Sequence, residues 1–139
     1  METEQVATAN RLLAYDTFDS KCPLRPIMDQ TTSRWATLIM SALIGGPHRF
    51  AQLHARVGGI SQKMLSQNLK ALARAGLVAR HVAPTKPPQV TYSLTELGVS
   101  LAGPLTDLIG WFGQHGDELL AAQTHYDSQY GLGGQRHSQ

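Results

Sequence analysis

Side chains that bind anions are concentrated in one stretch of the chain, GISQKMLSQNLKALARAGLVARHVAPTKPPQVTYSLTELG (residues 59–98). This stretch carries five Lys or Arg residues among Gln and Ser side chains, and its only acidic residue is Glu96. Lys and Arg neutralise phosphates, whereas Gln and Ser hydrogen-bond to base edges or to phosphate oxygens. The residue types therefore indicate contact with a polyanion.

Acidic and basic residues are unevenly distributed along the whole chain. The chain has 12 basic and 10 acidic residues, a net charge of +2. No Asp or Glu occurs from Gln30 to Thr95, whereas the remaining segments carry all ten acidic residues and only four of the basic ones. This asymmetry favours a surface directed at a polyanion. An ordinary solvated basic surface is the alternative interpretation.

Three helices are predicted in this acid-free segment from their apolar spacing. The first is amphipathic and ends at the breaker cluster GGP (residues 45–47), and the second is short and spans about residues 50–57. The third begins after Ser61, a good N-cap residue, and ends before Gly76, the expected C′ residue. The predicted apolar stripes are Trp35, Leu38, Ile39, Ala42 and Leu43, then Phe50, Leu53 and Val57, then Leu65, Leu69 and Leu72.

An extended pair of segments follows the third helix. LVARHVAP is rich in β-branched residues, QVTYSL alternates apolar and polar side chains, and the prolines of TKPP cannot continue a strand ladder. These segments predict a two-stranded hairpin with Lys86 at its tip. Thr95 is then expected to cap a last long helix, with a kink or a restart at Pro104. Its predicted stripe is Leu97, Leu101, Leu105, Leu108, Ile109 and Phe112.

Three helices and a hairpin in this order predict a winged helix-turn-helix, a mainly α fold with a small β-hairpin wing (α+β). The polar face of the third helix could enter the major groove of DNA, and the hairpin could reach the backbone or the neighbouring minor groove. We expect Lys70 and Arg74 on this helix to contact DNA phosphates. Arg80 and Lys86 on the wing are expected to contact the backbone or the neighbouring minor groove. The helix face predicted to contact DNA consists of Gln62, Lys63, Ser66, Gln67, Lys70 and Arg74.

Apolar residues beyond those needed for a small core predict a homodimer. We expect residues 1–21 to form a helical extension, residues 22–122 to form the DNA-binding domain with a C-terminal dimerisation helix, and residues 123–139 to be a flexible tail. Packing of both terminal segments on their own domain is the alternative. The predicted dimer contacts are Leu12, Leu13, Leu101, Leu105, Leu108, Trp111 and Phe112.

Cys22 is the single cysteine of the chain, so an internal disulfide is excluded. It precedes Pro23 and is predicted to lie at a helix N-cap, where helix N–H groups and the cations of Lys21 and Arg25 would favour a thiolate. Such a thiolate could sense oxidants or electrophiles. The alternative is that Cys22 is a small buried residue that serves packing.

Other function classes find little support in the residue pattern. The histidines lack the spacing of a metal site, no cofactor motif is present, and no histidine or carboxylate pattern accompanies Cys22, so we expect no enzyme and no metal. No apolar run approaches the roughly 20 residues of a membrane span. The polar, acidic start METEQVATAN is unlike a secretory signal, and the cytoplasm is the expected compartment.

Several motifs recur here in the order and spacing of one known family. They are the Cys-Pro at residue 22, a basic residue and Trp that open the first core helix, GPHRF, GISQKMLSQNLKAL, GLV, PPQVTYSLTELG and a helix that ends in WFG. On these motifs the chain resembles the HxlR family of bacterial winged-helix regulators, relatives of the MarR group. TTSRW departs from the Gly-Gly-Lys-Trp type of turn common in the family, although Thr32 or Ser33 can still cap the helix. Several members of the family sense oxidants through a cysteine.

The resemblance implies a homodimeric DNA-binding regulator, expected to be a repressor, at an inverted-repeat operator near its own or an adjacent gene. It implies wing contact by Lys86, and an oxidant or small molecule as effector. Two alternatives are a ligand-responsive regulator in which Cys22 does not sense, and a non-catalytic adaptor. The candidate residues for lining such a ligand pocket are Trp35, Tyr92, Trp111 and Phe112, for which packing in the core is the favoured alternative role. The DNA contacts that the resemblance implies on the third helix are Ser61, Gln62, Lys63, Ser66 and Gln67.

Overall fold

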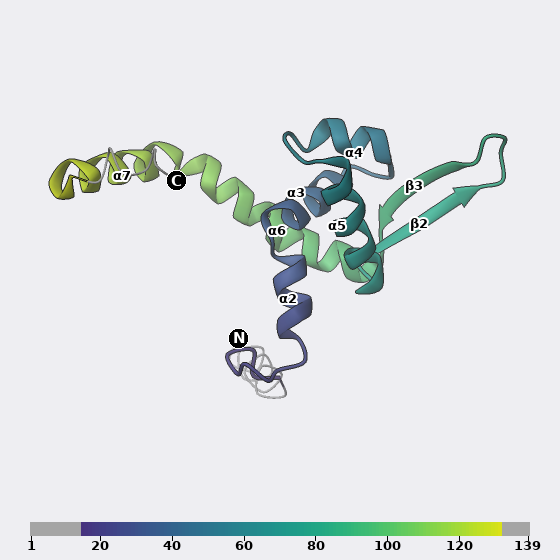
Figure 1. The fold of residues 1–139 in the computed structure, drawn as a ribbon, viewed down its shortest axis with the longest axis horizontal. Helices are drawn as coiled ribbons and strands as arrows, with labels where there is room; N and C mark the ends of the chain where they lie inside the picture. The colour runs from purple at the N-terminus through teal and green to yellow at the C-terminus, as the bar shows by residue number, and fades with distance from the viewer. Residues whose placement is uncertain (1–14, 132–139) are drawn as a thin grey trace, which may run out of the picture. The chain divides into compact units, whose positions relative to one another are not determined.

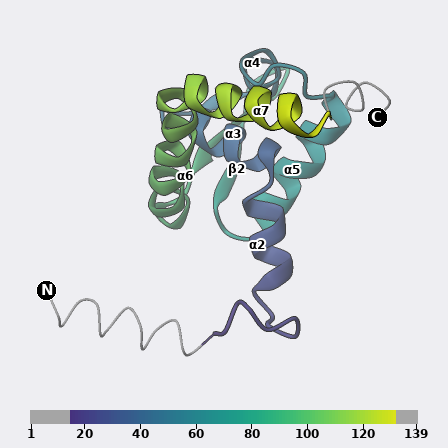
Figure 2. The same ribbon diagram turned by 90° about the vertical axis from the view of Figure 1, so that its left-hand side faces the viewer.

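The computed structural model describes residues 15–131 and contains the predicted winged helix-turn-helix (Figure 1). The chain divides into two structural units, of which one ends at Leu105 and the other begins at Thr106. The first unit contains the helix-turn-helix and the wing, and its helices α2, α3 and α5 pack on one another (Figure 2). The elements are α2 (Arg25–Thr31), α3 (Arg34–Leu43), β1 (His48–Arg49), α4 (Phe50–Arg56), α5 (Gln62–Arg74), β2 (Val78–Ala83), β3 (Gln89–Leu94), α6 (Glu96–Gln114) and α7 (Gly116–Tyr130).

The wing differs from the prediction because it contains three strands instead of two. The sheet has the order β1-β3-β2 and both pairings are antiparallel. The extra strand β1 is two residues long, so its sequence is too short to show an alternating pattern. It places His48 opposite Tyr92 and Arg49 opposite Thr91, which joins the start of α4 to the wing.

The core is formed by the three predicted helices, with a change in the phase of the first. In α3 the buried apolar residues are Ala36, Ile39, Met40 and Leu43, whereas Trp35 is only partly buried. The predicted stripe of this helix was therefore rotated by about one position from the buried face. Ser33 caps α3 by accepting a hydrogen bond from the Ala36 N–H (3.2 Å), as the sequence allowed.

Helix α5 begins and ends where its cap residues predict. The Ser61 hydroxyl accepts a hydrogen bond from the Met64 N–H at 3.0 Å. Gly76 has a φ of +78°, and the Leu77 N–H donates to the Leu72 carbonyl as in a Schellman motif. The predicted inner face of Leu65, Leu69 and Leu72 is buried.

Helix α6 starts at the end of the wing and packs closely against it. The Thr95 hydroxyl accepts a hydrogen bond from the Gly98 N–H (3.0 Å) and donates one to the Gly76 carbonyl (2.6 Å). A Cβ atom on Gly98 would overlap the carbonyl oxygen of Leu77, so only glycine permits this approach. The predicted stripe is partly wrong here, because Leu97 is 59% exposed and the buried residues are Gly98, Ala102 and Leu105.

The C-terminal elements also differ from expectation. Helix α6 continues through Pro104 as far as Gln114, so the restart predicted at this proline is wrong. The next helix begins at Gly116 and extends to Tyr130, so the tail predicted to be flexible from residue 123 is helical over its first part. No residue of α7 is buried. A helix without a buried face needs no apolar stripe, which is the signal by which a helix is predicted from sequence. In residues 15–131 no helix is long and apolar enough to cross a membrane.

Candidate nucleic-acid interface

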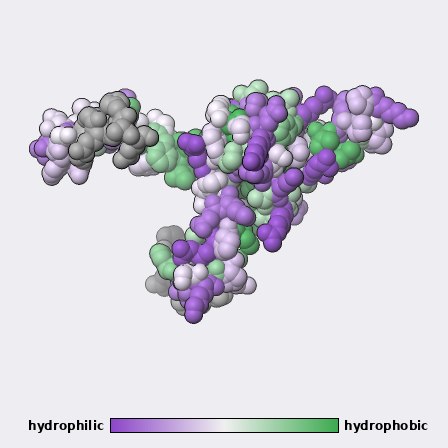
Figure 3. Space-filling model, viewed as in Figure 1, coloured by the Kyte–Doolittle hydropathy of each residue, from purple (hydrophilic) through white to green (hydrophobic). Residues whose placement is uncertain are grey.

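The polar face of α5 is exposed, directly opposite the leucines that bury the helix. A helical period of 3.6 residues places Lys63, Gln67, Lys70 and Arg74 on this outer face. All four are exposed, as is Gln62 in the first turn, whereas Ser66 is half-buried at the border of the face. Hydrophilic residues cover this region and much of the wing in Figure 3. The face is thus free to enter a groove of DNA.

Ser61 lies at the N-terminal end of the same face. Its oxygen accepts the Met64 N–H with one of its two lone pairs, so the hydroxyl proton and the second lone pair remain available. The residue can therefore hydrogen-bond to DNA while it holds the first turn of α5. The prediction of a contact at Ser61 is compatible with its capping role.

The wing carries the two other predicted cations. Arg80 lies on β2 opposite Tyr92 of β3, and both residues belong to one face of the sheet. Lys86 lies in the exposed connection between β2 and β3. There the Thr85 hydroxyl donates a hydrogen bond to the Pro87 carbonyl (2.9 Å). Lys86 is thus presented to solvent at the tip.

A small pocket of about 110 Å³ lies between α5 and the wing and brings three predicted contacts together. Two of its lining residues are cationic and two carry hydroxyl groups. Gln62, Lys63, Gln67 and Arg74 lie elsewhere on α5, and Lys86 lies at the tip of the wing. The residues that line the pocket are Ser66, Leu69, Lys70, Ala73, Arg80 and Tyr92.

Arg49 is a cation of this surface that the sequence analysis did not select. Its Nη2 donates a 2.8 Å hydrogen bond to the Gln89 side-chain oxygen on β3, and its backbone N–H donates to the Gln52 side chain at 2.8 Å. Both Arg49 and Gln89 are exposed. The acid-free segment contains Arg49, but the short strand β1 that places it beside the wing gave no signal in the sequence.

Cys22 is buried but does not cap a helix. Helix α2 starts at Arg25 with Leu24 as N-cap, so the predicted N-cap position of Cys22 is wrong by two residues. The Pro that favours helix initiation is Pro26, inside the first turn of α2. Cys22 is 8% exposed and lines a surface pocket of about 220 Å³ with Tyr15, Asp16, Asp19, Lys21 and Pro23.

The predicted dimer contacts separate into two groups in the structure. Leu105 is buried in the core of its own chain, and Leu101 packs against that core. Leu108, Trp111 and Phe112 belong to the second unit and are 44–55% exposed. Leu12 and Leu13 lie outside the described residues.

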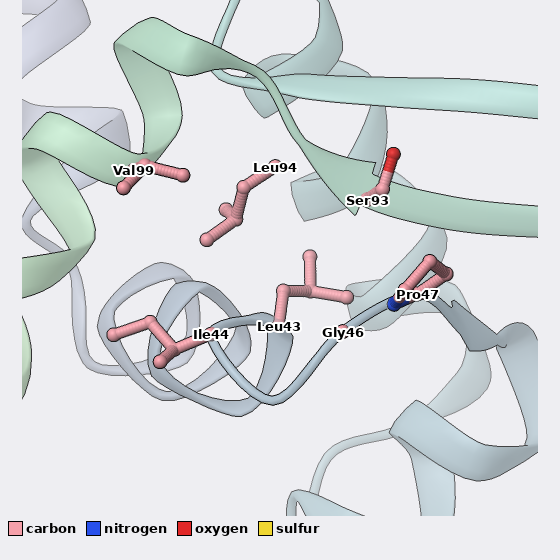
Figure 4. Close-up of a pocket in the computed structure, with 7 residues that line it drawn as sticks. All are labelled: Leu43, Ile44, Gly46, Pro47, Ser93, Leu94 and Val99. Atoms are coloured by element: carbon pink, nitrogen blue, oxygen red, sulfur yellow. The ribbon is translucent and has the colours of Figure 1, made fainter.

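An apolar pocket of about 250 Å³ lies between the end of α3, the end of β3 and the start of α6 (Figure 4). The residues predicted to line a ligand pocket, Trp35, Tyr92, Trp111 and Phe112, are not among those that line this pocket. The lining residues are Leu43, Ile44, Gly46, Pro47, Ser93, Leu94 and Val99.

Comparison with known proteins identifies the fold and the family. The family model described as HxlR-like helix-turn-helix matches residues 31–119. The HTH-type transcriptional regulator YtfH of Escherichia coli K12, whose own role is uncharacterized, is 40% identical over 119 residues, which are 86% of this chain and 94% of YtfH.

Two solved structures agree with this match. The ytfH regulator of Salmonella typhimurium is 40% identical, with a TM-score of 0.73 over 77% of this chain and 96% of that one. The redox regulator HypR in its oxidized form is 31% identical, with a TM-score of 0.62 over 67% of this chain and 96% of HypR. The exposed face of α5, the wing and these matches together establish that the chain belongs to the HxlR-like helix-turn-helix family and is a transcriptional regulator of the HxlR/MarR type.

Proposed function

We propose that this regulator binds an inverted-repeat operator as a homodimer and represses its own or an adjacent gene. The observation that carries the proposal is the exposed polar face of α5, where Gln and Ser side chains stand beside Lys63, Lys70 and Arg74 in a segment without acidic residues. Gln and Lys in a major groove hydrogen-bond to base edges, and the surrounding cations bind phosphates. The adaptor alternative gives no reason for the missing carboxylates.

The first experiment is a DNA-binding titration with the region upstream of the protein's own gene at two salt concentrations. Lys63→Glu is the test variant, and Lys21→Glu is its control because Lys21 is an exposed cation outside the acid-free segment. We expect selective binding that weakens steeply with salt and that only Lys63→Glu abolishes. If no duplex is preferred at any salt concentration, the adaptor function replaces this proposal.

The homodimer is supported by the exposed aromatic side chains of α6. The Trp111 and Phe112 rings meet edge to face with centroids 5.3 Å apart, and both residues are about half exposed. Burial of such surface against a second copy would form a two-fold dimer, and an operator with two half-sites one helical turn apart, roughly 34 Å, matches such a dimer. Phe112→Glu should therefore yield monomers in sedimentation velocity, whereas Val82→Glu, on the wing, should leave the dimer intact. A Phe112→Glu protein that remains dimeric would exclude this interface.

A response to oxidants through Cys22 is the second part of the proposal. HypR is named a redox regulator, and Cys22 lines a surface pocket although it is largely buried. The thiol could form a mixed disulfide with a small thiol, an intersubunit disulfide, or an alkylated product. We expect oxidant to lower operator affinity in the wild type and not in Cys22→Ser. Equal loss of affinity in both proteins would assign Cys22 to packing alone.

A further inference from the structure

We propose that the pocket between α5 and the wing binds one phosphate group of the DNA backbone, held from the helix and from the wing at once. This inference rests on the proposed DNA binding and adds to it a defined site for a single phosphate. Lys70 of α5 and Arg80 of the wing both line this one pocket.

The geometry of the two walls brings the phosphate-binding groups together. On α5, Ser66, Lys70 and Ala73 recur at the spacing of one helix face. On the wing, Arg80 and Tyr92 are directly opposite each other in the antiparallel pair β2–β3, so their side chains lie on the same side of the sheet. All five residues line the pocket.

The charge of the pocket favours an anion. Lys70 and Arg80 are both basic residues, and among residues 15–131 neither forms an ion pair with a carboxylate. Two like charges on one small pocket repel each other, and an anion between them removes this repulsion. The guanidinium of Arg80 can also donate two parallel hydrogen bonds to phosphate oxygens.

The size and the floor of the pocket favour a phosphate over a larger group. The volume of about 110 Å³ is small and suits one phosphate group. Leu69 and Ala73 supply an apolar floor, and a partly desolvated contact is stronger than one in open water. The hydroxyl groups of Ser66 and Tyr92 can donate further hydrogen bonds.

A phosphate held from both sides would fix the wing and α5 in one register on the duplex. Phosphate contacts orient a protein on DNA without reading sequence. The base contacts of Gln62 and Gln67 would then depend on this anchor for their position. The anchor is predicted to serve every operator sequence equally.

The test measures how the affinity for DNA depends on salt concentration, because this dependence reports how many DNA phosphates the protein neutralises. Each phosphate contact contributes about 0.9 to the slope of log affinity against log salt. We compare Lys70→Gln, Arg80→Gln and the double variant with Arg74→Gln/Lys86→Gln as the control pair, because Arg74 and Lys86 are exposed cations that lie outside the pocket and on different parts of the fold. All substituted side chains are exposed, and thermal melts of each variant verify folding.

If Lys70 and Arg80 share one phosphate, the double variant loses only about 0.9 of slope, and its loss of affinity differs from the product of the two single losses. The control pair should lose about 1.8, because it removes two separate contacts. A Lys70→Gln/Arg80→Gln protein that also loses about 1.8, with multiplicative losses, overturns the shared pocket but leaves DNA binding intact. Failure of the wild type to bind any duplex refutes the proposed function instead.

A second arm distinguishes a phosphate in DNA from the free ion. Inorganic phosphate and chloride are compared as competitors at equal ionic strength, for the wild type and for Arg80→Gln. If the salt slopes show a shared contact and phosphate competes no better than chloride, the pocket binds a phosphate only as part of the duplex backbone. Stronger competition by phosphate that disappears in Arg80→Gln shows that the same pocket also takes the free anion.

Discussion

Arg49 and Gln89 are 40 residues apart in sequence, yet the Arg49 guanidinium donates a 2.8 Å hydrogen bond to the Gln89 side-chain oxygen. The contact joins the N-cap of α4 to the first residue of β3, and the short ladder between β1 and β3 runs beside it. Arg49 is thereby held on the wing as an ordered, exposed cation. The wing and the helix-turn-helix are thus connected by side chains as well as by backbone.

Substitution of Gln89 should separate the stability of the wing from its affinity for DNA. Gln89→Ala removes an exposed hydrogen bond and should lower the free energy of unfolding by less than about 1 kcal/mol. Gln89→Glu keeps an acceptor for Arg49 and should preserve stability, but it introduces a carboxylate into the acid-free segment and should weaken DNA binding. Chemical denaturation and DNA titration of both variants measure the two effects. Undiminished DNA binding by Gln89→Glu would place β3 away from the duplex.

Substitutions of the cap residue Ser61 should likewise distinguish effects on the stability of α5 from effects on DNA affinity. Ser61→Ala removes the acceptor of the Met64 N–H and should cost about 1 kcal/mol of stability. Ser61→Asp restores the cap and favours the helix N-terminus, but it brings a negative charge to the proposed interface. We expect Ser61→Asp to be as stable as the wild type by denaturation and to bind the operator more weakly than Ser61→Ala. The reverse order of affinities would show that Ser61 lies outside the interface.

Two glycines of α6 should respond oppositely to the same substitution. A Cβ on Gly98 would overlap the Leu77 carbonyl and approach Leu94 Cδ2 to 3.3 Å, so Gly98→Ala should cost about 3 kcal/mol or more. A Cβ on Gly110, which is also within α6 and is not followed by a proline, meets no atom within 4 Å, so Gly110→Ala should stabilise the helix by about 0.5–1 kcal/mol. Urea denaturation of the two variants measures both values. Similar stability of the two proteins would contradict the close packing of α6 on Leu77.

The helix-turn-helix could be predicted because local signals and burial agree there. In α5 the leucine spacing, the Ser61 cap and the Gly76 terminus all indicate the same helix, and the structure has it. In α3 many apolar residues surround the helix, so composition did not decide between Trp35 and Met40 for the buried face. Tertiary packing made that choice.

Elements without local signals were missed. Strand β1 is two residues long and exists through its pairing with β3, which no local pattern records. Helix α7 buries no side chain, so its periodicity is weak. The position of Cys22 was wrong because two prolines, at 23 and 26, are both good first-turn residues and the helix uses the second. The pocket between α5 and the wing required the register of Arg80 and Tyr92, which only the folded hairpin sets.

Gln67 and Arg74 lie on the same exposed face of α5 but should affect DNA binding differently. A Gln amide that reads a base edge discriminates by about 1–3 kcal/mol, whereas an arginine on a phosphate binds every sequence alike. Gln67→Ala should therefore reduce the preference for the operator at one base pair in each half-site and leave the salt slope unchanged. Arg74→Gln should weaken all duplexes by a similar factor and lower the slope by about 0.9. Titrations with the operator, single-base variants and an unrelated duplex at several salt concentrations measure both properties. If Gln67→Ala weakens every duplex equally, α5 binds the backbone at this position, and the base readout must come from Gln62 or Lys63 in the first turn.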